Sequence, residues 1–163
     1  MNKWIPILAC VLMATTVHAE GMFSMTSSWT RDYDTMDYSG HRVTVGTLDG
    51  TTTVLESDRE PFVAGSHHLS RCLVYANRSE KSYQLDAWCI VTDRDNDKLF
   101  VFADRPKGDT QAGGGGKGRW HLQGGTGKYS GISGKCDYRV EYLGNDRVIN
   151  MTEDCKWNRR VDP

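Results

Sequence analysis

A predicted strand near the C-terminal end of the chain alternates charged and aromatic side chains. Because successive side chains of a strand point to opposite faces, Asp137, Arg139 and Glu141 share one face. Tyr138 and Tyr142 share the other. If the charged face pointed inward, the interior would hold paired ions, which is costly unless a ligand or a reaction uses them. Inward apolar alternation is the default, so we expect the tyrosines to face the core or an apolar pocket and the charges to face solvent.

The first nineteen residues have the pattern of a secretory signal peptide. Lys3 precedes the apolar run Trp4–Val17, and a small-residue cleavage pattern ends at Ala19. We therefore expect cleavage near Ala19, a secreted or periplasmic protein, and a single domain over residues 20–163. The apolar run is too short to be a comfortable membrane span, and no other segment approaches that length.

Four cysteines lie beyond the predicted signal peptide, and an even number in an exported chain indicates disulfides with three possible connectivities. Sequential strands are usually spatial neighbours. We therefore favour the pairs Cys72–Cys89 and Cys136–Cys155. The wide spacing and the lack of a C-x₂-C pair argue against a zinc site.

Composition and short motifs exclude several other classes of function. The chain carries 20 Lys and Arg against 21 Asp and Glu, without a basic stripe, so we expect no nucleic-acid partner. Asp93–Asp97 places three carboxylates on alternate positions like a calcium loop, but Lys98 stands where that loop needs glycine. The imidazoles of His67 and His68 point to opposite faces of one strand. We expect neither a metal nor an organic cofactor.

Two Val- and Thr-rich runs, His41–Leu48 and Thr51–Glu56, flank Asp49-Gly50, which predicts a hairpin. Glu20–Tyr38 predicts one strand followed by a loop at Thr30–Asp37. Further strands are predicted at Ser66–Ala76, Ser82–Thr92, Leu99–Ala103, Lys117–Leu122, Cys136–Leu143 and Arg147–Trp157. Eight or nine short strands without a helical period indicate an all-β antiparallel barrel of about eight strands, held by disulfides.

Two glycine-rich stretches interrupt these strands. Gly108–Gly118 predicts a mobile loop. Gly124–Gly134 has five glycines in eleven positions and predicts a tightly turned connection. We expect its large apolar side chains, Tyr129 and Ile132, to fold back and plug one end of the core.

The segment Gly124–Gly134 resembles the Gly-Gly-Thr-Gly-Lys-(Tyr/Phe)-x-Gly-x-x-Gly signature of the dirigent and allene oxide cyclase-like barrel superfamily, particularly its small exported bacterial members. The order of elements over Ser66–Asn158 is similar to that family. The resemblance implies an eight-stranded lipocalin-like or allene oxide cyclase-like barrel, assembly into a homo-oligomer such as a trimer, and activity without a cofactor. The functional acidic and basic residues of the family do not match positions of this chain.

Three functions remain open. The leading hypothesis is a non-enzymatic exported barrel that binds a small apolar or aromatic ligand between Trp88, Tyr138 and Tyr142, or that serves as an envelope structural module. The alternative is a cofactor-free isomerase or a dirigent-like guide of radical coupling. Arg139 would be its electrostatic stabiliser and Glu141 its acid or base. The third is a protein-interaction module that uses the glycine-rich loop.

Overall fold

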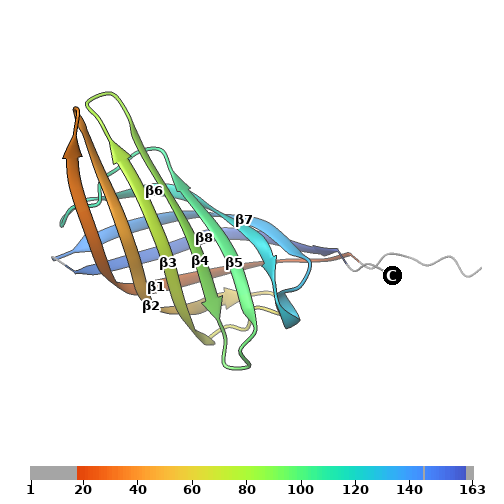
Figure 1. Cartoon of the computed structure of the whole chain (residues 1–163). Coiled ribbons are helices and arrows are strands. Elements are labelled where there is room, and N and C mark those ends of the chain that lie inside the picture. Colours follow the sequence, from red (N-terminus) through yellow and green to blue (C-terminus); the bar gives the residue numbers. More distant parts are fainter. Residues whose placement is uncertain (1–17, 145, 161–163) are drawn as a thin grey trace, which may run out of the picture.

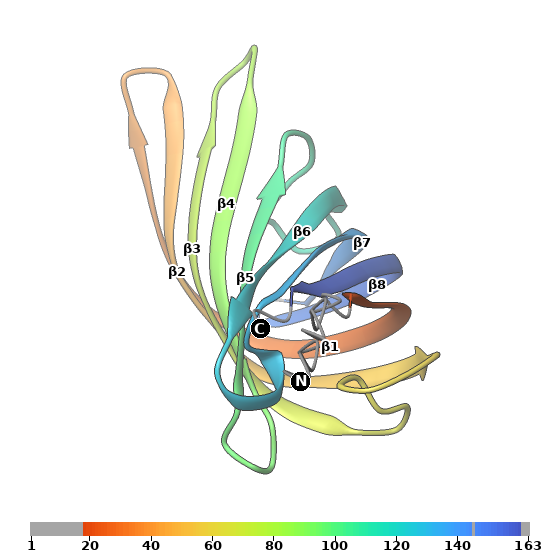
Figure 2. The same cartoon turned by 90° about the vertical axis from the view of Figure 1, so that its right-hand side faces the viewer.

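The computed structural model describes residues 18–144 and 146–160, which form a closed barrel of eight antiparallel strands (Figure 1). Each strand pairs with its neighbours in the chain, and the last strand pairs with the first, so the sheet curves around a common interior (Figure 2). The predicted all-β barrel is confirmed. The elements are β1 (His18–Tyr38), β2 (His41–Ser57), β3 (His67–Arg78), β4 (Tyr83–Thr92), β5 (Lys98–Arg105), β6 (Gly115–Gly125), the 3₁₀ turn η1 (Gly127–Tyr129), β7 (Ile132–Leu143) and β8 (Arg147–Arg160).

Strict alternation decides which side chains of β7 fill the barrel. Tyr138 and Tyr142 are buried, as predicted, together with Val140 between them. The positions between these residues, Arg139 and Glu141 among them, are exposed. The apolar side of β7 therefore faces the interior and its charged side faces solvent.

The strand β2 runs through Asp49 and Gly50 without a turn, so the hairpin predicted there is wrong. The chain turns earlier, at Ser39 and Gly40, which have φ of 49° and 79°. A Cβ at Gly50 would lie 2.0 Å from the carbonyl oxygen of Ser28 on β1. Glycine inside a strand often marks such a close approach of two backbones. The Asp-Gly pair therefore makes room for β1 and does not reverse the chain.

Two segments predicted as loops belong to strands. The polar run Thr30–Asp37 continues β1, and residues 115–118 begin β6, which leaves 106–114 as the loop. A Cβ at Gly118 would lie 2.5 Å from Cζ of Tyr138. This glycine therefore leaves space for a side chain inside the barrel, which is a different role from chain mobility.

Both predicted disulfides are confirmed. Cys72–Cys89 joins β3 to β4, and Cys136–Cys155 joins β7 to β8. All four side chains are buried in the barrel. Disulfides are typical of proteins from oxidising compartments, which fits an extracytoplasmic protein. The predicted signal peptide, Met1–Ala19, lies outside the described residues except for its last two positions.

Aromatic side chains close one end of the barrel. The rings of Phe23 and Phe62 stack with centroids 3.8 Å apart, and the rings of Tyr129 and Trp157 lie 5.8 and 5.9 Å from Phe62. Tyr129 comes from η1, and Ile132 beyond it is buried as well. The glycine segment thus places both of its large apolar residues in the core, as expected.

Asp93 fastens the glycine segment to the turn between β4 and β5. Its Oδ1 accepts hydrogen bonds from the amides of Asp95 and Asp97 at 2.8 and 2.9 Å. Its Oδ2 lies 2.6 Å from Nζ of Lys128, and its side chain is 1% exposed. Burial acts to raise the pKa of Asp93, but Lys128 and the two amides outweigh it and hold the pKa below its usual 3.8.

Replacing Asp93→Asn is expected to lower the free energy of unfolding at pH 7 by about 2 kcal/mol, because the buried ion pair loses one partner. The amide oxygen keeps the two backbone hydrogen bonds. A lowered folded-state pKa stabilises above the unfolded value and loses its effect as the pH falls through the folded value. Urea unfolding should therefore show the difference from wild type shrinking below about pH 4.

The matched control is Asp95→Asn. Its carboxylate lies 3.2 Å from the same Nζ, but its side chain is 59% exposed. Exposed ion pairs contribute about 0–1 kcal/mol, so we expect a loss of about 0.5 kcal/mol or less. Equal losses in the two variants would contradict the assignment of the buried pair.

Candidate functional site

The unusual residue of the interior is Arg105, the last residue of β5. Leu99, Val101 and Ala103 occupy the buried positions before it, and the alternation carries Arg105 to the same face. Its side chain is therefore directed into the barrel, and the residue is 1% exposed. Arginine is almost never fully buried unless it is paired.

Only one nitrogen of the Arg105 guanidinium has partners. Nη2 donates to the hydroxyl of Tyr83 at 2.7 Å, to the carbonyl oxygen of Asp109 at 3.0 Å and to the hydroxyl of Tyr142 at 3.3 Å. Nε and Nη1 are buried without a hydrogen-bond partner. Arginine has five N–H donors, two of them on Nη2, so the one on Nε and the two on Nη1 lack an acceptor.

The charge of Arg105 also has no counter-charge. The ion pairs found in the described part of the chain include none with Arg105. Burial acts to lower its pKa, but the surrounding phenols, Tyr142 first, raise the pKa above its usual value. The guanidinium therefore stays charged, and burying an unpaired charge is strongly unfavourable.

The neighbouring tyrosines cannot supply the missing negative charge. Burial raises the pKa of Tyr83 to about 12. It also raises the pKa of Tyr33 and of Tyr138 above the ordinary value of 10. These three hydroxyls therefore stay protonated at neutral pH.

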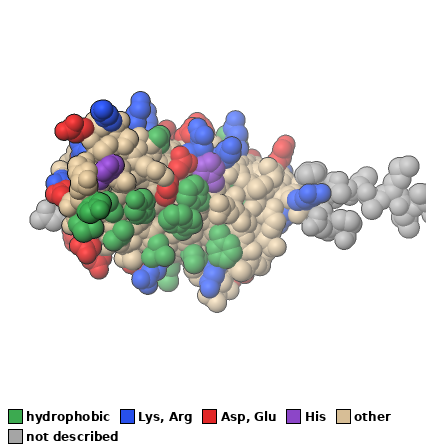
Figure 3. Space-filling model, turned by 45° about the horizontal axis from the view of Figure 1, so that its top comes forward, with side chains coloured by type: hydrophobic (Ala, Val, Ile, Leu, Met, Phe, Trp, Pro, Cys, Tyr) green, Lys and Arg blue, Asp and Glu red, His purple; other side chains and the backbone are tan. Residues whose placement is uncertain are grey.

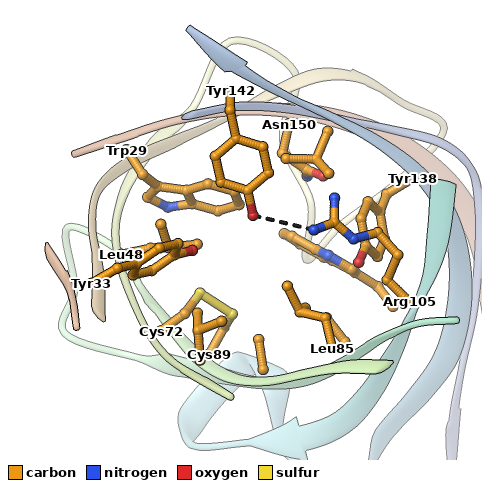
Figure 4. A pocket seen from close by; sticks show the side chains of 15 residues that line it. Trp29, Tyr33, Leu48, Cys72, Leu85, Cys89, Arg105, Tyr138, Tyr142 and Asn150 are labelled. Atoms are coloured by element: carbon orange, nitrogen blue, oxygen red, sulfur yellow. Dashed lines mark hydrogen bonds between the residues drawn. A yellow bond between two sulfur atoms is a disulfide. The ribbon is translucent and has the colours of Figure 1, made fainter. Parts of the chain in front are cut away.

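A cavity of about 30 Å³ lies beside Arg105. One water needs about 10–15 Å³, so the cavity has room for only a few atoms. Figure 4 shows the guanidinium directed between Tyr142 and Asn150. The 15 described residues that line the cavity are Trp29, Tyr33, Leu48, Cys72, Val74, Leu85, Ala87, Cys89, Ala103, Arg105, Trp120, Tyr138, Val140, Tyr142 and Asn150.

Four buried side-chain atoms of the lining residues lack a hydrogen-bond partner, and each of them can donate. Besides Nε and Nη1 of Arg105 they are the hydroxyl of Tyr33 and the side-chain nitrogen of Asn150. Buried polar groups are normally paired, because an unpaired one loses its hydration without compensation. A cluster of unpaired donors around a cation is suited to an anionic acceptor.

The loop 106–114 crosses the barrel next to Arg105. The carbonyl oxygen of Asp109 accepts from Arg105, and that of Thr110 accepts from Arg31. The carboxylate of Asp109 forms an ion pair with Arg78, whose Nη1 lies 2.7 Å away. Three arginines from three strands thus hold this loop against one end of the barrel. The aromatic cluster of Phe23, Phe62, Tyr129 and Trp157 closes the other end.

Trp88 was expected to line the pocket, and that placement is wrong. It is 52% exposed and lies opposite Leu73 of β3 and Phe102 of β5 on the outer face of the sheet. Figure 3 shows apolar side chains gathered on one face of the molecule. In β4 the inward positions belong to Leu85 and Ala87, so Trp88, next to Ala87, points outward.

Arg139 and Glu141 are exposed on β7, as the alternation of that strand predicted, so the alternative that required them inside the barrel is wrong. They cannot act on a molecule inside the barrel from there. Tyr138 and Tyr142 are the two candidates that do line the cavity. Arg105 was missed because the predicted strand stopped at Ala103. Two more residues of the same alternation would have placed it inside.

Residues 18–144 and 146–160 lack two other kinds of feature. No group of three or more His, Cys, Asp or Glu side chains is arranged to hold a metal ion. No helix in these residues combines the length and apolar composition that crossing a membrane requires.

No family model, curated protein or solved structure matches the chain. The similarity of Gly124–Gly134 to the dirigent and allene oxide cyclase-like signature stays a prediction.

Proposed function

We propose that this protein binds a small, partly apolar molecule inside its barrel, next to Arg105. The main support is Arg105, which lines the cavity and whose buried Nε and Nη1 have no hydrogen-bond partner. The walls of the cavity include Trp29, Trp120 and Tyr138, whose ring centroids lie 6.4 Å apart from one to the next. Apolar walls with a few convergent polar groups are typical of ligand sites.

An occupant of more than a few atoms requires the loop 106–114 to move. A site for a drug-sized ligand needs about 300–1,000 Å³, well above the cavity of about 30 Å³. The loop is held mainly by hydrogen bonds and by the partly exposed ion pair of Asp109 with Arg78. Such contacts contribute little individually. Opening the barrel at this loop therefore costs less free energy than opening it at the aromatic cluster of Phe23, Phe62, Tyr129 and Trp157.

Ala87→Leu is expected to lower the occupancy of the barrel at least about tenfold, because the larger side chain enters the cavity space. Native mass spectrometry of protein purified from the export compartment of its host should show a mass excess for wild type that is lost on denaturation. The variant should show the mass of the bare chain.

Ala76→Leu is the matched control, since Ala76 is buried in the same barrel but does not line the cavity. It should retain the mass excess. A wild-type protein that carries no molecule and takes up none of the acids or alcohols tested in the next subsection would refute ligand binding.

The enzyme, structural and interaction hypotheses remain predictions. An isomerase or a guide of radical coupling has no assigned residues, because Arg139 and Glu141 lie outside the barrel. An envelope structural role, an interaction through the glycine-rich loop and a homo-oligomer remain predictions from the sequence. Export with cleavage near Ala19 is part of the proposal and is supported by the two disulfides.

A further inference from the structure

The chemical class of the ligand follows from what the interior lacks. The charged guanidinium of Arg105 carries five N–H donors. Those on Nε and Nη1 have no acceptor. The hydroxyl of Tyr33 and the side-chain nitrogen of Asn150 are unpaired on the same lining. A neutral acceptor such as a carbonyl would satisfy some of these donors but would leave the charge uncompensated in a low-dielectric interior.

We propose that the ligand is a monocarboxylate, whose carboxylate group binds Arg105 under the loop 106–114 while its apolar part contacts the aromatic walls. This inference rests on the proposed function and specifies the ligand of the same site. Guanidinium and carboxylate are both planar, and their charge-assisted hydrogen bonds are about twice as strong as neutral ones.

One negative charge fits the site better than two. Arg105 is the only charged residue among the described residues that line the cavity. A phosphate monoester or a sulfate dianion would bury an extra negative charge without a second cation on the lining. The second anionic oxygen of a carboxylate can accept from Tyr33 or Asn150.

The surroundings also favour an organic acid over a bare inorganic ion. A halide would pair with Arg105 but would make no use of the buried aromatic surface of Trp29, Trp120 and Tyr138. Burial of apolar ligand surface against such walls contributes roughly 25 cal/mol per Å². A carboxylate attached to an alkyl or aryl group uses both features of the site.

The test compares acids with neutral molecules of the same shape. Protein freed of co-purified molecules by unfolding and refolding is titrated calorimetrically with benzoate and decanoate, and with benzyl alcohol and 1-decanol. We expect at least one acid to bind about thirtyfold or more tighter than its alcohol, as for a buried charge pair that loses one partner. In Arg105→Met this preference should disappear.

Arg139→Met is the matched control, because it removes the same charge from the exposed face of β7. It should retain the preference for the acid. Thermal unfolding in acetate and in chloride at equal ionic strength separates a carboxylate from a bare anion. Only acetate should raise the melting temperature of wild type, since a ligand stabilises the state that binds it.

Each other result overturns the inference in a distinguishable way. Equal affinities for acids and alcohols would refute the carboxylate but leave ligand binding in the barrel standing. Equal stabilisation by chloride and acetate would show a site for small anions in general and would refute the carboxylate. A preference that survives in Arg105→Met would exclude Arg105 as its cause. Binding of none of the four probes would count against the proposed function itself.

Discussion

Arg105→Met is expected to raise the free energy of unfolding of the ligand-free protein by about 4 kcal/mol, because it removes an unpaired buried charge at similar side-chain length. The wild-type guanidinium gives up its hydration and recovers the three hydrogen bonds of Nη2 together with contacts to the rings of Tyr83 and Tyr142, whose centroids lie 5.4 and 5.5 Å from Cζ. A hydrogen bond between two neutral groups contributes about 1 kcal/mol to stability. With a charged donor, as here, the contribution rises to as much as about 3 kcal/mol. The free-energy cost of removing the ion from water exceeds that gain.

Urea unfolding measures this difference, after bound molecules have been removed. Arg105→Lys is the control, since it keeps a charge at this position but loses the planar set of donors, and it should not be stabilised. A loss of stability in Arg105→Met would mean that the contacts with Tyr83, Tyr142 and Asp109 serve the fold. A gain would identify a residue that lowers stability, as functional residues often do.

Gly50→Ala is expected to lower the free energy of unfolding by about 5 kcal/mol, at the upper limit for a single substitution. The added Cβ would lie 2.0 Å from the carbonyl oxygen of Ser28 and 2.9 Å from Cα of Trp29. Both atoms belong to the backbone of β1 and cannot move without breaking the ladder between β1 and β2. Trp29 lines the cavity, so the substitution should also disturb the candidate site.

Gly40→Ala provides the comparison for Gly50→Ala. At Gly40 an added Cβ meets nothing within 4 Å, and only the positive φ of 79° opposes alanine. A loss of about 1 kcal/mol is expected there. Chemical denaturation of the two variants under the same conditions measures the difference. If Gly50→Ala were as mild as Gly40→Ala, the continuous strand through Gly50 would be wrong and the predicted hairpin would be right.

Local rules were sufficient for much of this protein. The barrel of about eight strands and the pairing of the four cysteines follow from alternation and from the rule that sequential strands lie side by side. The same alternation placed Tyr138 and Tyr142 inside, because the charged residues Asp137, Arg139 and Glu141 share the opposite face of that strand. The plug formed by Tyr129 and Ile132 followed from their being the large apolar residues of a glycine-rich segment.

The sequence alone determined an all-β barrel, its disulfides and the inward face of β7. The tertiary structure decided the inward face of β4, where Trp88 and Ala87 give both faces apolar residues and alternation cannot choose. The tertiary structure also decided the role of Gly50. A residue without a Cβ fits a turn and a close approach of two backbones equally well, so the sequence could not distinguish them. Finally, the tertiary structure decided that Arg105 is buried, since a charge at a strand end normally reaches solvent unless the closed barrel surrounds it.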